Sequence, residues 1–151
     1  MFPGNAVEAV NFYVSVFPDS KVIQTSTYKK DEPGPEGQVR TVSFELMGMH
    51  AVAANARGDN FKFSQGLTLM VECDDQQQID TLTKKLLDAG GKQEDCGWVV
   101  DPYGVSWQIV PKLVRKIMDG KDSAKADRMV HALFQMKKLD IDALERAANG
   151  N

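Results

Sequence analysis

The sequence lacks the features that mark membrane proteins, secreted proteins and proteins with structural metal sites. It has no apolar run of about 18 residues, and no basic start followed by an apolar middle. We therefore expect a cytoplasmic protein with no membrane partner. Cysteine is scarce, since Cys73 and Cys96 are the only two and neither has a CxxC partner. We predict that both are free thiols.

Positive charge is also too sparse for a nucleic-acid binder. The net charge is −3, and apolar residues interrupt the densest basic stretch, residues 112–116. Phosphate contacts require a clustered basic surface, so we expect no nucleic-acid partner. The 151 residues, of which 42% are hydrophobic and 26% charged, are instead typical of an ordinary globular protein with its own core.

Several segments have the apolar spacing and the capping residues of helices. Asn5 with Glu8, and Asp75 with Gln78, have the three-residue spacing of capping pairs at helix starts. The expected helices cover residues 6–17, 76–89, 123–138 and a short stretch after Asp140, with a further turn or two over 112–118.

Strand-like runs lie between these helices. The alternation is clearest over 39–46, where Val42, Phe44 and Leu46 point one way and Glu45 points the other. The expected strands cover residues 21–28, 39–46, 50–56, 66–73, 97–100 and 105–110, with one more opening at Gly91, and tight turns at 48–49 and 101–104.

The order of these segments repeats at an offset of 70 residues. Asn5 and Asp75 cap the two helices, and Lys21 and Gly91 open the strands that follow. The second half has a strand before its helix, whereas the first half has only residues 1–4 in that place. We predict two α/β modules, 1–61 and 66–111, with the first strand of the first module apparently absent.

Three stretches of the chain are distinctive: FPGNAVEA at 2–9, CGWVVDPYGVSWQIVP at 96–111 and QMKKLDI at 135–141. Together they resemble the PhnB-like branch of the glyoxalase/bleomycin-resistance/dioxygenase (vicinal oxygen chelate) superfamily. The resemblance implies an α+β fold in which paired βαβββ modules form a cupped mixed sheet around a small-molecule cavity. It implies a single domain over 1–111, a C-terminal helical extension over 112–151, and a homodimer.

Some members of this family carry the name 3-demethylubiquinone-9 3-methyltransferase. A methyltransferase of the usual kind binds S-adenosylmethionine with a Gly-rich loop between a strand and a helix, and no GxGxG-like run occurs here. We therefore expect this protein to share the methyltransferase name of these members but not the methyltransferase activity.

The resemblance also implies where a metal would bind. Superfamily enzymes hold a divalent metal with side chains of the first and last strands of both modules. Those positions fall on Gln108, near Asn55 and near Thr68, and the fourth would lie in the absent strand. Amides bind divalent cations poorly without carboxylate or imidazole neighbours, and His50 and His131 have no metal-binding spacing. We expect neither a metal nor another cofactor.

Other residues are candidates for a ligand cavity. Gln108 must point opposite to Trp107 in a strand, so Trp98 shares the cavity wall if Gln108 faces it, and Trp107 is then core. Cys96 has acidic neighbours that disfavour the thiolate, so we interpret it as a lining thiol rather than a nucleophile. Glu45 is either the acid of the cavity or a solvent-exposed side chain.

These observations favour a small-molecule-binding protein without a metal, with no reaction assigned. Two alternatives stay open: an isomerase or lyase of the superfamily that uses Glu45 or a recruited metal, and a resistance-type protein that sequesters an aromatic drug. An open aromatic groove would favour sequestration, and a converging cluster of carboxylate, amide and water would favour an enzyme. The candidate ligand-binding residues are Gln108, Trp98, Asn55, Glu45, Cys96 and Thr68.

Overall fold

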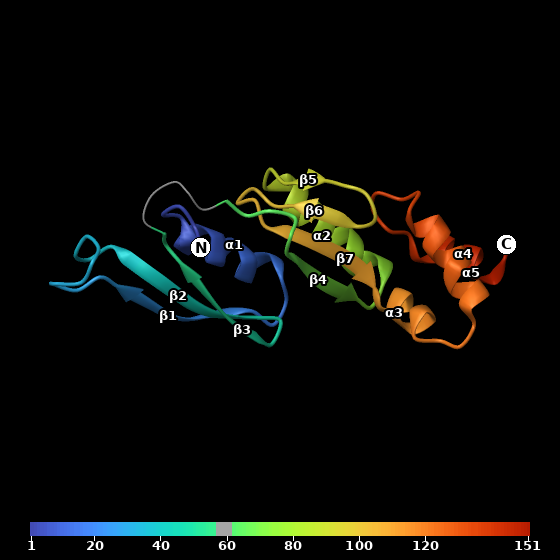
Figure 1. Cartoon of the computed structure of the whole chain (residues 1–151), viewed down its shortest axis with the longest axis horizontal. Coiled ribbons are helices and arrows are strands. Elements are labelled where there is room, and N and C mark those ends of the chain that lie inside the picture. The colour runs from blue at the N-terminus through green and yellow to red at the C-terminus, as the bar shows by residue number, and fades with distance from the viewer. Residues whose placement is uncertain (57–61) are drawn as a thin grey trace. The chain divides into compact units, whose positions relative to one another are not determined.

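The computed structural model describes residues 1–56 and 62–151 (Figure 1). The chain forms two compact units, 1–62 and 63–151. The strands agree with the predicted ones to within two residues at each end. Within the described ranges, no helix combines the length and apolar character that a membrane crossing requires.

The first unit packs one helix, α1 (Ala6–Val16), on a sheet of three antiparallel strands (Figure 1). The strands are β1 (Lys21–Thr27), β2 (Val39–Leu46) and β3 (Met49–Ala54). The predicted alternation of β2 is confirmed, because Val42, Phe44 and Leu46 are buried. The tight turn lies one residue earlier than predicted, at Met47–Gly48, where both residues have the positive φ that a two-residue hairpin turn requires.

A single residue, Phe2, stands where the first strand of this module was expected. Its N–H donates to Ala54 O at 2.8 Å, and Ala56 N–H donates to Phe2 O at 2.7 Å. These bonds form an isolated parallel bridge between Phe2 and Asn55. Parallel pairing is what the first strand of a βαβββ module makes with the last one. Phe2 therefore makes the parallel pairing that such a strand would make.

The start of α1 corrects the predicted capping box. The Asn5 side chain makes no capping hydrogen bond, and its Oδ1 is buried without a partner among the described residues. Instead, Asn55 Oδ1 accepts a hydrogen bond from Ala6 N–H at 2.9 Å, while its Nδ2 donates to Val39 O at 3.0 Å. A side chain from beyond β3 thus caps the helix, which local spacing does not reveal.

The second unit contains the complete βαβββ order. Strand β4 (Thr68–Cys73) precedes α2 (Gln76–Asp88), and β5 (Lys92–Gln93), β6 (Trp98–Val100) and β7 (Ser106–Pro111) follow. The strand order in the sheet is β4-β7-β6-β5, with β4 and β7 parallel. The predicted cap of α2 is confirmed, because Asp75 accepts a hydrogen bond from Gln78 N–H at 2.8 Å.

The turn between β6 and β7 is built on a buried carboxylate. Asp101 is 4% exposed, and its Oδ1 accepts hydrogen bonds from Tyr103 N–H at 2.8 Å and from Val105 N–H at 2.9 Å. Its Oδ2 accepts from Trp107 Nε1 at 2.9 Å. A buried carboxylate requires such donors, and here they fix both the turn and the indole of Trp107.

Three helices complete the second unit: α3 (Lys112–Met118), α4 (Ser123–Leu133) and α5 (Ile141–Asn149) (Figure 1). The predicted helix over 123–138 was too long. The carbonyls of Met136 and Lys137 accept hydrogen bonds from Cys96 and Gly97 N–H, at 2.7 and 2.6 Å. These hydrogen bonds to the turn between β5 and β6 hold residues 134–140 as a turn between α4 and α5.

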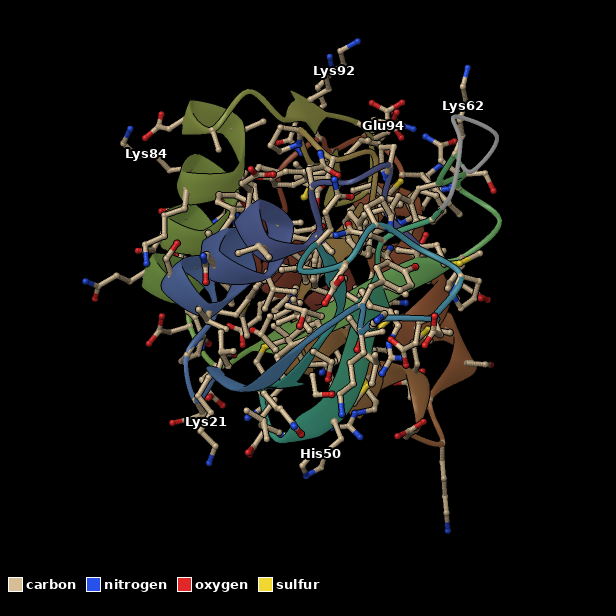
Figure 2. All side chains as sticks on the ribbon, turned by 90° about the vertical axis from the view of Figure 1, so that its left-hand side faces the viewer. Lys21, His50, Lys62, Lys84, Lys92 and Glu94 are labelled. Atoms are coloured by element: carbon tan, nitrogen blue, oxygen red, sulfur yellow. The ribbon has the colours of Figure 1, made fainter. Side chains whose placement is uncertain are left out.

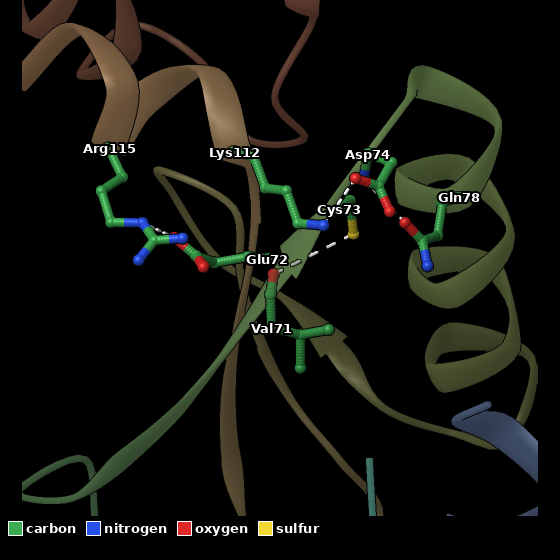
Figure 3. A network of polar contacts seen from close by, with 7 residues as sticks. All are labelled: Val71, Glu72, Cys73, Asp74, Gln78, Lys112 and Arg115. Carbon is green, nitrogen blue, oxygen red and sulfur yellow. Dashed lines mark hydrogen bonds and ion pairs between the residues drawn. The ribbon is translucent and has the colours of Figure 1, made fainter. Parts of the chain in front are cut away.

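Polar contacts fasten these helices to the rest of the unit. Lys112 and Arg115 of α3 form ion pairs with Asp74 and Glu72, at 2.6 and 2.7 Å (Figure 3). Gln76, at the start of α2, donates to Leu139 O at 3.1 Å and accepts from Ile141 N–H at 2.9 Å. The C-terminal helices therefore belong to the packing of the second unit.

The helices also supply their own apolar core. The residues buried together are Val110, Ile117, Met129, Leu133, Leu139, Leu144 and Ala148. Met129 and Leu133 are therefore covered within the unit itself. Phe134, which directly follows Leu133, is 65% exposed.

We predict that Asn55→Ala destabilises the protein by about 1–3 kcal/mol, because it removes the cap of α1 and the partner of Val39 O. The matched change Asn5→Ala should alter the free energy of unfolding by less than about 0.5 kcal/mol, since that side chain caps nothing. Urea unfolding followed by circular dichroism measures both. Equal losses in the two variants would contradict the assignment of the cap to Asn55.

Candidate functional site

The two faces of the second sheet differ in character. Trp98 of β6 and Met70 of β4 lie directly opposite Gln108 of β7, so these three side chains share one face. Trp107 and Ile109 point to the other face, where α2 packs, and both are almost fully buried. The predicted division of the tryptophans is confirmed in this respect: Trp107 is core, and Trp98 shares a face with Gln108.

An open groove of about 670 Å³ lies beside Trp98 and Gln108. One wall comes from β5, β6 and the turn over 93–98 that joins them. The opposite wall comes from the end of α4 and the turn after it, through Leu133, Phe134 and Lys137. Three of the six predicted ligand-binding residues, Gln108, Trp98 and Cys96, therefore come together in one groove.

The apolar part of the groove is aromatic. The indole of Trp98 is half-buried, and the ring of Phe134 is 65% exposed. A large aromatic side chain held at a groove with most of its surface in water is available for contact with a ligand. Phe134 was not among the predicted ligand-binding residues, because the helix predicted over 123–138 runs past it.

The polar part of the groove surrounds Trp98. Gln108 Nε2 donates to Cys96 O at 3.2 Å, and Gln93 Nε2 donates to Trp98 O at 3.1 Å. On the rim, Gln65 Nε2 donates to Glu94 Oε2 at 2.5 Å. Both amides are thus held by main-chain carbonyls, which gives them fixed orientations, and Gln108 is the one on the same face as the indole.

A tight bend at Cys96 and Gly97 gives the groove its shape. Both residues have positive φ, 58° and 80°. A Cβ on Gly97 would lie 2.5 Å from Ile109 O, so only glycine fits against β7 there. The bend aims the N–H groups of both residues at the turn after α4 and directs Cys96 O toward Gln108.

The thiol of Cys96 is not activated. Burial, and to a lesser extent the nearby Asp95 carboxylate, raise the pKa of the Cys96 thiol above its ordinary value. Burial likewise raises the pKa of Cys73 to about 11. Both thiols are therefore protonated at neutral pH, which favours the interpretation of Cys96 as a lining group over that of a nucleophile.

The other three candidates lie outside this groove. Asn55 and Glu45 belong to the first unit, where Asn55 uses both polar atoms of its side chain and Glu45 forms an ion pair with Lys21 at 3.1 Å. Thr68 lies at the start of β4, and its hydroxyl contacts Ser106 Oγ at 3.3 Å. A ligand role for these residues stays a prediction.

The donor set does not fit a divalent metal. Within residues 1–56 and 62–151, no three His, Cys, Asp or Glu side chains come close enough together to hold one. His50 projects outward from the first unit at the start of β3 (Figure 2), and His131 is exposed on α4. Gln108, at the position matched to a metal ligand, has no carboxylate or imidazole beside it in the sheet, where its neighbours are Trp98 and Met70.

S-adenosylmethionine does not fit the second unit either. The usual site for this cofactor is a glycine-rich turn between a parallel strand and a helix. The corresponding turn, between β4 and α2, is Asp74–Asp75, and the Asp75 carboxylate occupies the helix N-terminus. This turn has no glycine and already carries negative charge, which opposes the binding of the cofactor's carboxylate.

The model of the family described as 3-demethylubiquinone-9 3-methyltransferase matches residues 1–110. The chain belongs to this family. The sequence resemblance to PhnB-like proteins is thereby confirmed. The C-terminal helices, with the groove wall at Leu133, Phe134 and Lys137, lie beyond the matched residues.

Solved structures agree with this assignment. The chain is similar to a PhnB protein from Bacillus cereus that carries the same methyltransferase name: the identity is 36%, over 74% of this chain and 94% of that one, with a TM-score of 0.64. A protein from Pseudomonas aeruginosa, 17% identical over 73% of this chain and 91% of its own, shares the fold with a TM-score of 0.60. No curated protein matches the chain.

The different burial of the two tryptophans predicts different costs of replacement. Trp107→Ala should destabilise the protein by about 3–5 kcal/mol, as a large-to-small change in a core. Trp98→Ala should cost clearly less. Chemical unfolding measures both values, and acrylamide should quench the fluorescence of Trp98 but hardly that of Trp107. A tolerant Trp107 with an indispensable Trp98 would show that the faces are assigned wrongly.

Proposed function

We propose that this family member binds a small planar aromatic molecule, without changing it chemically, in the groove of the second unit. The observation that carries the proposal is the pairing of Trp98 with Gln108 across β6 and β7, opposite the exposed ring of Phe134. Flat apolar walls with a few fixed polar groups are typical of small-molecule sites.

The chemistry of the groove favours binding over catalysis. Its one thiol is protonated at neutral pH, and its amides are neither acids nor bases. Of its two carboxylates, Asp95 is exposed to water and Glu94 accepts a hydrogen bond from the Gln65 amide. The groove is open, whereas strong electrostatic catalysis depends on a site from which water is excluded. The alternative of an isomerase or lyase depended on Glu45 or on a recruited metal. The Glu45 carboxylate is paired with Lys21 in the first unit, and no three His, Cys, Asp or Glu side chains of the described residues come together to hold a metal.

A thermal-shift screen of planar aromatic compounds tests the proposal. A ligand that binds only the folded state at 100 times its Kd stabilises that state by about 2.7 kcal/mol, which raises the Tm measurably. Trp98→Ala should abolish the shift produced by each compound that binds. The control Met118→Ala removes a side chain that is 52% exposed on α3, outside the groove, and should leave the shift unchanged. Equal effects of the two changes would contradict the proposal.

We also propose that the protein is a cytoplasmic homodimer. Two large apolar side chains of the sheets, Val52 and Met70, are more than half exposed, and so is Leu67 just before β4. The free energy falls when a second copy of the chain covers apolar surface of this kind. We therefore expect light scattering at tens of micromolar protein to give the mass of a dimer, and a monomer at that concentration would contradict the proposal.

A further inference from the structure

The polar atoms of the groove point to a ligand of a particular chemistry. We infer that the groove selects planar aromatic cations that donate hydrogen bonds, such as amino-substituted heteroaromatic rings in their protonated form. The inference rests on the proposed function, and deepens it by naming the class of ligand.

The orientation of the two amides is the first argument. Gln108 Nε2 lies 3.2 Å from Cys96 O, and Gln93 Nε2 lies 3.1 Å from Trp98 O and 3.2 Å from Glu94 O. A carbonyl only accepts hydrogen bonds, so exchanging the N and O atoms of either amide would place two acceptors against each other. The amide orientations are therefore determined by their partners.

It follows that Gln108 keeps its oxygen for a ligand. Its Nε2 donates one N–H to Cys96 O, and no described residue donates to its Oε1. Gln108 lies opposite Trp98 and shares its face, whereas Gln93 lies opposite Val99 and belongs to the face of Trp107. A ligand that packs on the Trp98 indole thus meets an oriented acceptor, the Gln108 Oε1.

The carboxylates of the groove are the second argument. Gln65 occupies only Oε2 of Glu94, and the Asp95 side chain has no hydrogen bond or ion pair with the described residues. Lys137 is the one cation among the described residues that line the groove. Two carboxylates and one ammonium give the groove a net charge of −1.

These features discriminate between ligand classes. A cation with N–H donors satisfies the free oxygens, and its charge is attracted both by the carboxylates and by the faces of Trp98 and Phe134. A neutral ring without donors would remove water from those oxygens without replacing the hydrogen bonds that the water made. An anionic ring would be repelled by Glu94 and Asp95 and would find only Lys137.

Three probes of similar size test this inference: proflavine, a diamino-substituted acridine that is cationic, acridine at pH 8, which is neutral, and anthracene-2-sulfonate, which is anionic. Titrations of nucleic-acid-free protein, read by quenching of Trp98 fluorescence and by calorimetry, give the affinities. We expect proflavine to bind about ten-fold tighter or more than acridine, and the sulfonate to bind weakest. The affinity for proflavine should fall as salt is added.

Isosteric variants separate charge from shape. Asp95→Asn and Glu94→Gln should each weaken the binding of proflavine by about three- to ten-fold while leaving acridine unchanged. The control Asp119→Asn makes the same change of charge at an exposed position outside the groove, and should alter neither affinity.

The outcomes distinguish the inference from the function on which it rests. One outcome is that the unchanged protein binds all three probes with equal affinity while Trp98→Ala abolishes the binding of each. In that case the groove is the site, and the selection for cations is wrong. Tighter binding of the sulfonate than of proflavine would overturn the selection as well. If no probe binds, or if Trp98→Ala changes none of the affinities, the proposed function itself fails.

Discussion

The groove depends on two main-chain hydrogen bonds between segments 40 residues apart. Cys96 and Gly97 N–H donate to the carbonyls of Met136 and Lys137, and so join the β5–β6 turn to the turn between α4 and α5. The bonds require two successive residues of positive φ and the absence of a side chain at position 97. Without them, neither wall of the groove would face the other, and Gln108 would lose its acceptor.

Much of the fold could be predicted from the sequence, because local rules determine it. The alternation of Trp107 and Gln108 has the period of a strand, and it correctly placed one side chain in the core and the other on the open face. Asp75 caps α2 through a partner three residues away. Asn5 failed as a cap because Asn55, from the far end of the sheet, takes that role, and spacing along the chain contains no sign of it.

The sequence likewise predicts one wall of the groove and not the other. The wall from β6 and β7 was predicted, since both its faces follow from the strand period and from the resemblance to PhnB-like proteins. The wall from the end of α4 was not, because the apolar pattern of that helix continues past the residue where contact with the sheet ends it. Phe134, at the point where the helix ends, is an exposed ring at the groove.

This division limits what the family name can say about the ligand. The matched residues, 1–110, include Trp98 and Gln108 but not Phe134 or Lys137. A fold supports many functions, and the chemistry of a site lies in the particular side chains placed on it. Here the family scaffold supplies an indole and an oriented amide, while the C-terminal part supplies the second aromatic ring and Lys137, the one cation that lines the groove within residues 1–56 and 62–151. The ligand class must therefore be argued from the complete groove of this chain, in which two carboxylates accompany one ammonium, and a methyltransferase name does not determine it.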